Sequence, residues 1–299
     1  MTQRAAIAAA LLFLATPPLA AQTSSQRVRT DTALASLIAA EKAFSAASEK
    51  DGAQAAFLRF LTPEALIYRP KVVKAHAFLR ASPMPPALLL LWEPVFADVS
   101  RAGDLGYTTG PWISQRRDAP QADPAFGQYV TIWQRQADKT WKAVLDAGIA
   151  HGADPVGPRG IEAPPASDWR GTAAQNSGAQ RSMMQADSVL NRTVARLGAA
   201  TAIQQRAAPH MRLLRMGRDP LVRDSAMNFL RATNNYTWRA VGGGMASSGD
   251  LGYVYGVYAV PVNGPGRESG DYLRIWRRNA VGEWQVVLDL TSPEAPVRR

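Results

Sequence analysis

The segment Gly103-Asp104-Leu105-Gly106-Tyr107 recurs as Gly249-Asp250-Leu251-Gly252-Tyr253, 146 positions further along the chain. The same offset aligns positions before and just after this motif, and a three-residue deletion then changes the offset to 143. The aligned pairs are Gly52 with Gly198, Pro63 with Pro209, Arg69 with Arg215, Trp92 with Trp238, Gly110 with Gly256, Tyr129 with Tyr272, Ile132 with Ile275, Trp133 with Trp276, Arg135 with Arg278, Trp141 with Trp284, and Val144-Leu145-Asp146 with Val287-Leu288-Asp289. A constant register over so many spaced positions predicts a tandem duplication of one structural unit.

Each copy has the same predicted order of elements. Apolar residues at helical spacing predict a helix over roughly residues 31–50 and again over roughly 183–194, each followed by a glycine. A short helix is expected next, over residues 53–61 and 199–208, ended by Pro63 or Pro209, and then a short strand over 65–69 and 211–215. The last part of each copy alternates as antiparallel strands do, over 129–135 and 141–146 in the first copy. Helices first and strands last indicate an α+β fold.

The 299 residues are 46% hydrophobic and 19% charged, which is typical of a globular chain with two domains. Zero cysteines exclude disulfides and thiolate metal sites, and three scattered histidines leave little for a histidine metal site. No phosphate-binding glycine loop or serine-hydrolase elbow is present. We therefore expect neither a metal nor a cofactor.

The N-terminus is typical of a secretory signal. Arg4 precedes an apolar run over residues 5–15, and Leu19-Ala20-Ala21 offers a small-residue cleavage site. We expect residues 1–21 to be a signal peptide and the protein to be periplasmic or secreted, although an uncleaved anchor remains an alternative. The mature chain is expected not to insert stably in a membrane, because no later apolar run is long enough.

The remaining boundaries follow from the repeat and from composition. We expect a flexible N-terminus over 22–30, a first domain over 31–151, a Pro/Gly-rich linker over 152–174, a second domain over 175–292 and a tail over 293–299. The formal net charge is +10, with the excess of arginine in the second half. The arginines are dispersed and do not alternate with aromatic residues, so nucleic-acid binding is not expected.

The leading helix together with the G-D-L-G-Y, Y-x-x-I-W and W-x-x-V-L-D patterns resembles the nuclear transport factor 2-like (NTF2-like) superfamily, in its SnoaL-like, DUF4440-type branch. The resemblance covers both copies. It implies two cone-shaped α+β barrels, in each of which a curved sheet wraps around a long helix and leaves a pocket. Members often dimerise through the sheet, so the resemblance also implies an intramolecular pseudo-dimer, with a homodimer of the chain as the alternative.

Asp146 and Asp289 are the candidate catalytic residues, because each follows a Val-Leu pair near the end of a predicted strand. A carboxylate in an apolar pocket has a raised pKa and can act as a general acid or base. The alternative is a structural carboxylate that caps a hairpin, since fold maintenance would also preserve it in both copies.

Arg69 and Arg215 are candidate ligand-binding residues, able to hold a carboxylate ligand or to pair with the aspartate of their own copy. Four tyrosines could donate hydrogen bonds into a pocket: Tyr107, Tyr129, Tyr253 and Tyr272. The paired tryptophans are expected to serve packing, and Asp104 and Asp250 are expected to be turn residues.

Three functions remain open. The first is a module that binds a small, largely apolar or acidic molecule in a cone pocket. The second is a cofactor-independent isomerase, lyase or hydrolase that uses a pocket aspartate. The third is an envelope scaffold. One cone could be functional and the other structural.

Overall fold

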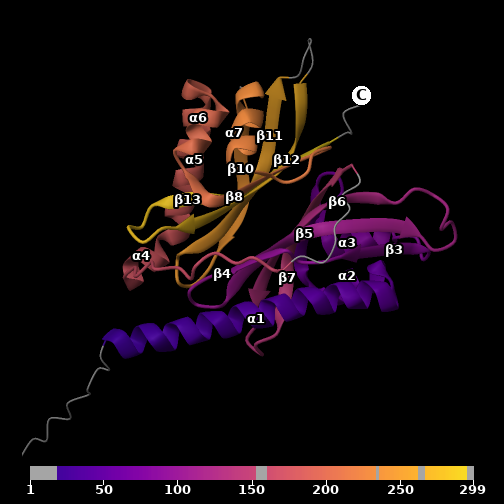
Figure 1. Ribbon diagram of the computed structural model, residues 1–299, viewed down its shortest axis with the longest axis horizontal. Coiled ribbons are helices and arrows are strands. Elements are labelled where there is room, and N and C mark those ends of the chain that lie inside the picture. The colour runs from indigo at the N-terminus through magenta and orange to yellow at the C-terminus, as the bar shows by residue number, and fades with distance from the viewer. Residues whose placement is uncertain (1–18, 153–159, 234–235, 262–266, 295–299) are drawn as a thin grey trace, which may run out of the picture.

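The structure is a computed structural model that describes residues 19–152, 160–233, 236–261 and 267–294 (Figure 1). Within these ranges the two copies form two separate sheets, each with its own helices. The predicted signal peptide falls mainly on residues 1–18, outside the described residues. No helix within the described ranges is both long and apolar enough to cross a membrane.

The first half consists of three helices and seven strands. In chain order they are α1 (Leu19–Asp51), α2 (Ala53–Phe60), β1 (Leu61–Tyr68), β2 (Val72–Lys74), α3 (Ala75–Ala81), β3 (Leu88–Trp92), β4 (Phe96–Val99), β5 (Leu105–Arg116), β6 (Ala125–Arg135) and β7 (Trp141–His151). The sheet order is β2-β1-β7-β6-β5-β3, with β4 also paired to β5. All pairs are antiparallel except β1 with β7.

The second half repeats this plan. Its elements are α4 (Ala173–Ser177), α5 (Ala179–Leu197), α6 (Ala199–Gln204), β8 (Ala207–Arg215), β9 (Leu221–Val222), α7 (Arg223–Ala232), β10 (Thr237–Met245), β11 (Leu251–Pro261), β12 (Arg267–Arg278) and β13 (Trp284–Pro293). The sheet order is β10-β11-β12-β13-β8-β9, again with one parallel pair, β13 with β8. The prediction of two α+β units is therefore confirmed.

The repeated G-D-L-G motif forms a tight turn against the long helix of its own half. Gly103 and Gly249 have φ of 70° and 66°, which favours glycine. A Cβ on Gly106 would lie 2.5 Å from Leu37 of α1, and a Cβ on Gly252 would lie 2.7 Å from Met183 of α5. The second glycine of each motif therefore allows the close approach of helix and sheet.

The aspartate of each motif bonds to the other half. Arg101 N donates to Asp250 Oδ2 at 3.0 Å, and Ser247 N donates to Asp104 Oδ2 at 3.0 Å. Arg101 and Ser247 are themselves equivalent at the offset of 146. The two bonds are thus related by a pseudo-two-fold symmetry, so these aspartates do more than shape their own turns.

An apolar cluster between the outer faces of the two sheets completes this contact. It includes Val130, Ile132 and Leu145 from the first sheet and Leu273, Ile275 and Leu288 from the second. The opposite face of each sheet packs on the helices, as Trp133 does near Phe44 of α1, with ring centroids 6.0 Å apart. The halves therefore form an intramolecular pseudo-dimer through their sheets (Figure 1).

The structure differs from several local expectations. Residues 22–30, expected to be flexible, are helical, because no glycine or proline interrupts the chain between Leu19 and Gly52. Pro63 and Pro209 do not directly end the short helices but lie inside β1 and β8. They stand where the pairing to β7 and β13 shifts register, so no ladder hydrogen bond is lost. The helices α3 and α7 were not predicted, and Pro293, assigned to the tail, belongs to β13.

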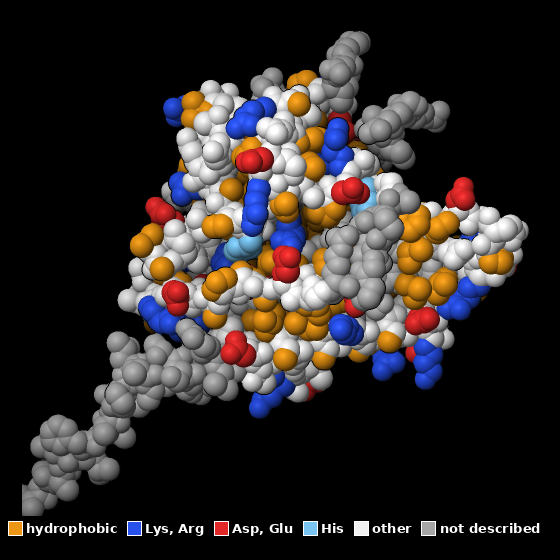
Figure 2. Space-filling view, viewed as in Figure 1, with side chains coloured by type: hydrophobic (Ala, Val, Ile, Leu, Met, Phe, Trp, Pro, Cys, Tyr) orange, Lys and Arg blue, Asp and Glu red, His pale blue; other side chains and the backbone are white. Residues whose placement is uncertain are grey.

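On the face shown in Figure 2, lysine and arginine side chains are interspersed with aspartate and glutamate.

Candidate functional site

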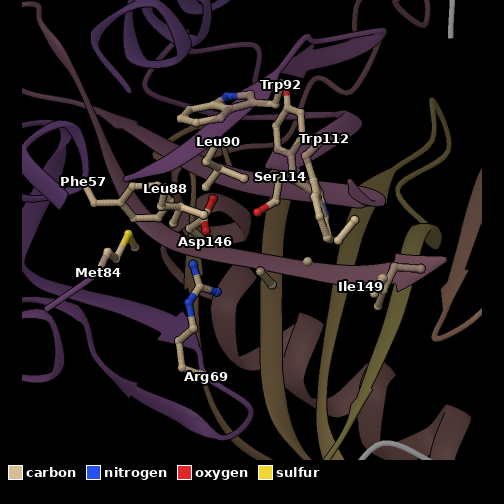
Figure 3. A pocket seen from close by; sticks show the side chains of 15 residues that line it. Phe57, Arg69, Met84, Leu88, Leu90, Trp92, Trp112, Ser114, Asp146 and Ile149 are labelled. Carbon is tan, nitrogen blue, oxygen red and sulfur yellow. The ribbon is translucent and has the colours of Figure 1, made fainter. Parts of the chain in front are cut away.

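The first half contains a cavity of about 340 Å³ between its sheet and its helices. Most of the wall is apolar, and three side chains on it, Arg69, Ser114 and Asp146, carry strongly polar groups (Figure 3). The lining residues are Phe57, Arg69, Met84, Leu88, Leu90, Trp92, Trp112, Ser114, Ala125, Tyr129, Asp146, Ala147, Gly148, Ile149 and Ala150. An apolar cavity of this size with few polar groups is typical of a small-molecule site.

Asp146 reaches the cavity because side chains alternate along β7. Its neighbours Leu145 and Ala147 join the cluster between the sheets, so the carboxylate faces the helices of its own half. The Thr131 hydroxyl donates to Asp146 Oδ2 at 2.9 Å. Burial raises the pKa of Asp146 to about 6, against the opposing influence of Arg69 and Thr131. The carboxyl group therefore changes its protonation state near pH 6.

Arg69 directly follows β1, the strand that pairs with β7. Its guanidinium is directed toward Asp146 of β7 (Figure 3). Arg69 Nη1 donates to the Tyr68 carbonyl at 2.7 Å, and the guanidinium lies 5.8 Å from the Phe57 ring centroid. Among the ion pairs within 4 Å in the described part of the chain, none joins Arg69 to Asp146. The guanidinium and the carboxylate therefore line the same cavity without forming an ion pair.

A second buried carboxylate, Glu41 of α1, lies behind the cavity wall. It accepts hydrogen bonds from Trp92 Nε1 at 2.5 Å, Trp133 Nε1 at 2.8 Å and the Thr108 hydroxyl. Burial raises the pKa of Glu41 to about 7, these three donors oppose the rise, and Asp146 adds to it. Glu41 thus positions Trp92, which lines the cavity.

The equivalent region of the second half holds a network of buried ion pairs. Arg274 Nη1 donates to Asp187 Oδ1 at 2.6 Å, and Arg274 Nε donates to Asp289 Oδ2 at 2.7 Å. Arg215 Nη2 donates to Asp289 Oδ1 at 2.6 Å. Although burial raises the pKa of Asp289, the two guanidiniums hold it below its usual value. Asp289 is therefore a structural, fully paired carboxylate.

The repeat register explains the contrast between the halves. At the offset of 143, Asp146 matches Asp289 and Thr131 matches Arg274, and at the offset of 146, Glu41 matches Asp187. The first half retains both carboxylates but has a short hydroxyl side chain where the second has a guanidinium. The cavity lies in the half that lacks this guanidinium.

The structure separates the residues that the sequence singled out. Asp146, Arg69 and Tyr129 meet at the cavity, whereas Asp289 and Arg215 form an ion pair. Of the other tyrosines, Tyr272 donates to Asp187 Oδ2 at 2.9 Å inside the second half, and Tyr107 and Tyr253 pack in the cluster between the sheets. Trp133, Trp141, Trp276 and Trp284 are buried as expected.

Sequence reasoning missed Glu41, Thr131 and Arg274. The repeat register aligns these positions, so a comparison of unlike aligned residues, and not only of identical ones, would have shown them. Trp92 was expected to pack, yet it also lines the cavity. In the described ranges, no group of three or more His, Asp or Glu side chains could hold a metal ion.

No family model matches the chain, and no curated protein does so either. Similar solved structures include an NTF2-like superfamily protein from Salmonella enterica, with 15% identity over 43% of this chain and 97% of that one and a TM-score of 0.34. A ketosteroid isomerase-like protein from Erwinia carotovora has 17% identity over 40% of this chain and 97% of that one, with a TM-score of 0.33. A putative scytalone dehydratase from Novosphingobium aromaticivorans has 9% identity over 47% of this chain and 98% of that one, with a TM-score of 0.35. Each half of the chain has the α+β arrangement that the resemblance to the NTF2-like superfamily implied, and NTF2-like structures are among those that the chain matches.

Proposed function

We propose that the first half binds one small, largely apolar molecule whose polar end lies at Asp146 and Arg69. The observation that carries this proposal is that Arg69 and Asp146 line the same cavity without forming an ion pair. Their equivalents in the second half, Arg215 and Asp289, form an ion pair with an N–O distance of 2.6 Å. The apolar wall would bind the body of the ligand through the hydrophobic effect, and the two charges would orient its polar end.

A titration with a neutral aromatic probe, 1-naphthalenemethanol, tests the proposal. Calorimetry on the full chain should detect saturable binding. The variant Thr131→Arg should abolish it, because the equivalent guanidinium of Arg274 lies 4.8 Å from the ring centroid of Trp238, the counterpart of the cavity residue Trp92. Thr131→Val is the matched control and should still bind. Equal binding by wild type and Thr131→Arg would place the probe elsewhere and refute the proposal.

A proton-transfer enzyme is the second candidate, because burial brings the pKa of Asp146 to about 6 at a cavity wall. Asp146 would then remove or deliver a proton on a bound carbon acid, with no cofactor. The test is deuterium incorporation next to the carbonyl of 1-tetralone in D₂O, followed by NMR. Wild type should accelerate the exchange and Asp146→Asn should not; equal rates would refute catalysis by Asp146.

We also propose that the protein is exported to a periplasm or beyond, a proposal supported by the pattern of residues 1–21 alone. N-terminal sequencing of the protein from an extracytoplasmic fraction should begin at Gln22. A mature chain that begins at Met1 would contradict cleavage there.

A further inference from the structure

The second half carries a cation in a cage of carboxylates and aromatic rings. The guanidinium of Arg274 bridges Asp187 and Asp289 and lies 4.8 Å from the ring centroid of Trp238 and 5.2 Å from that of Tyr272. Arg274, Asp187 and Asp289 are all fully buried. Paired carboxylates and aromatic faces are the surroundings that stabilise a desolvated cation.

The first half keeps the counterparts of the four caging side chains. The repeat register matches Glu41, Asp146, Trp92 and Tyr129 to them, with Thr131 where the second half has the cationic side chain. Three of the four, Asp146, Trp92 and Tyr129, line the cavity. The cage is thus conserved within the chain, but the cation that it surrounds in the second half is missing from the first.

We infer that the molecule bound in the first half has a cationic head, an ammonium or amidinium, on an apolar body, with the head beside Asp146 and against Trp92 and Tyr129. This inference rests on the function proposed above, and it specifies the class of ligand. The head would stand where the guanidinium of Arg274 stands in the other half.

Arg69 is compatible with a second cation at Asp146. In the second half one carboxylate holds two cations, since Asp289 accepts Arg215 at Oδ1 and Arg274 at Oδ2. Asp146 Oδ2, which accepts the Thr131 hydroxyl, matches the oxygen that Arg274 occupies. Glu41 adds negative charge behind Trp92, and burial keeps its pKa near 7, so a nearby cation would favour its ionised form.

Three probes of one shape test the head group: 1-naphthylmethylammonium, neutral 1-naphthalenemethanol and anionic 1-naphthoate, titrated calorimetrically into the full chain at pH 7.5. The ammonium should bind about tenfold or more tightly than the alcohol, and the naphthoate more weakly than the alcohol. Asp146→Asn should bring the affinity for the ammonium to within about threefold of the affinity for the alcohol. Thr131→Val, which retains both carboxylates, should keep the preference for the ammonium.

The outcomes separate the two proposals. If the alcohol binds at the cavity but the ammonium binds no better, or if naphthoate binds best, the cationic head is refuted and the pocket function stands. A preference for the ammonium that survives in Asp146→Asn also refutes it. If none of the three probes binds, the pocket function fails, and the cationic head fails with it.

Discussion

Replacing Arg274 by threonine, the residue at the matching position of the first half, should destabilise the second half strongly. The substitution removes the guanidinium that bridges Asp187 and Asp289 at 2.6 and 2.7 Å. Asp289 keeps its ion pair with Arg215 at 2.6 Å, but Asp187 keeps only neutral donors such as Tyr272 and Trp276. Removing one partner of a buried ion pair costs about 3–5 kcal/mol.

Glu41 shows the direction and the order of magnitude of this cost, because it is the matching carboxylate without an arginine. Burial raises its pKa from 4.5 to about 7. At about 1.4 kcal/mol for each pKa unit, this rise corresponds to a destabilisation of a few kcal/mol at high pH, the same order as the cost of removing one partner of a buried ion pair. A carboxylate with a raised folded pKa destabilises the protein above that pKa, and the penalty disappears below its unfolded value. The loss in Arg274→Thr should therefore be larger at pH 8 than at pH 5.

The assay is urea denaturation at pH 5 and pH 8, followed by circular dichroism and tryptophan fluorescence. Arg116→Thr is the matched control, since its ion pair with Asp118 is solvent-exposed and its loss should leave the urea midpoint nearly unchanged at both pH values. The reasoning is refuted if Arg274→Thr loses less than about 1 kcal/mol at pH 8, or if its loss is the same at both pH values.

Two further substitutions have defined outcomes in the same denaturation assay. Asp250→Ala should lower the free energy of unfolding by about 1–3 kcal/mol, because the Arg101 amide and the Ser248 hydroxyl lose their acceptor at the contact between the halves; an unchanged midpoint would argue against that contact. Asp146→Asn should stabilise the protein by about 3 kcal/mol at pH 8 and by much less at pH 4, because burial raises the pKa of Asp146 to about 6 and ionisation above that pH opposes folding. A destabilised Asp146→Asn at pH 8 would show that the carboxylate is structural.

The duplication was readable from sequence because the features that define the fold are repeated side chains at a fixed register. Gly103 and Gly249 are required by positive φ, and Gly106 and Gly252 by the approach of a helix, so both pairs are identical in the two copies. By contrast, α3 was not predictable, because its seven residues are too few to show the helical repeat of apolar side chains. The bonds from Asp104 and Asp250 to the other half depend on the docking of two sheets, which no local pattern encodes.

The candidate site was predictable only in part. Asp146, Arg69 and Tyr129 were found because their types suit a pocket, and the structure brings them to one cavity. Their matching residues in the second half were singled out for the same reason, yet Arg274 fills the place between the carboxylates there. Whether the repeated carboxylate lines a cavity or forms an ion pair depends on the residue paired with it on the adjacent strand, Thr131 in the first half and Arg274 in the second. The type of the carboxylate residue alone does not reveal this.

The central claim is that the two halves are unequal, with a ligand cavity at Asp146 in the first and buried ion pairs at the equivalent position in the second. Native mass spectrometry of the full chain with saturating 1-naphthylmethylammonium counts the occupied sites directly. The account predicts one bound probe per chain for the wild type and none for Thr131→Arg. Two bound probes per chain, or one that persists in Thr131→Arg, would contradict it.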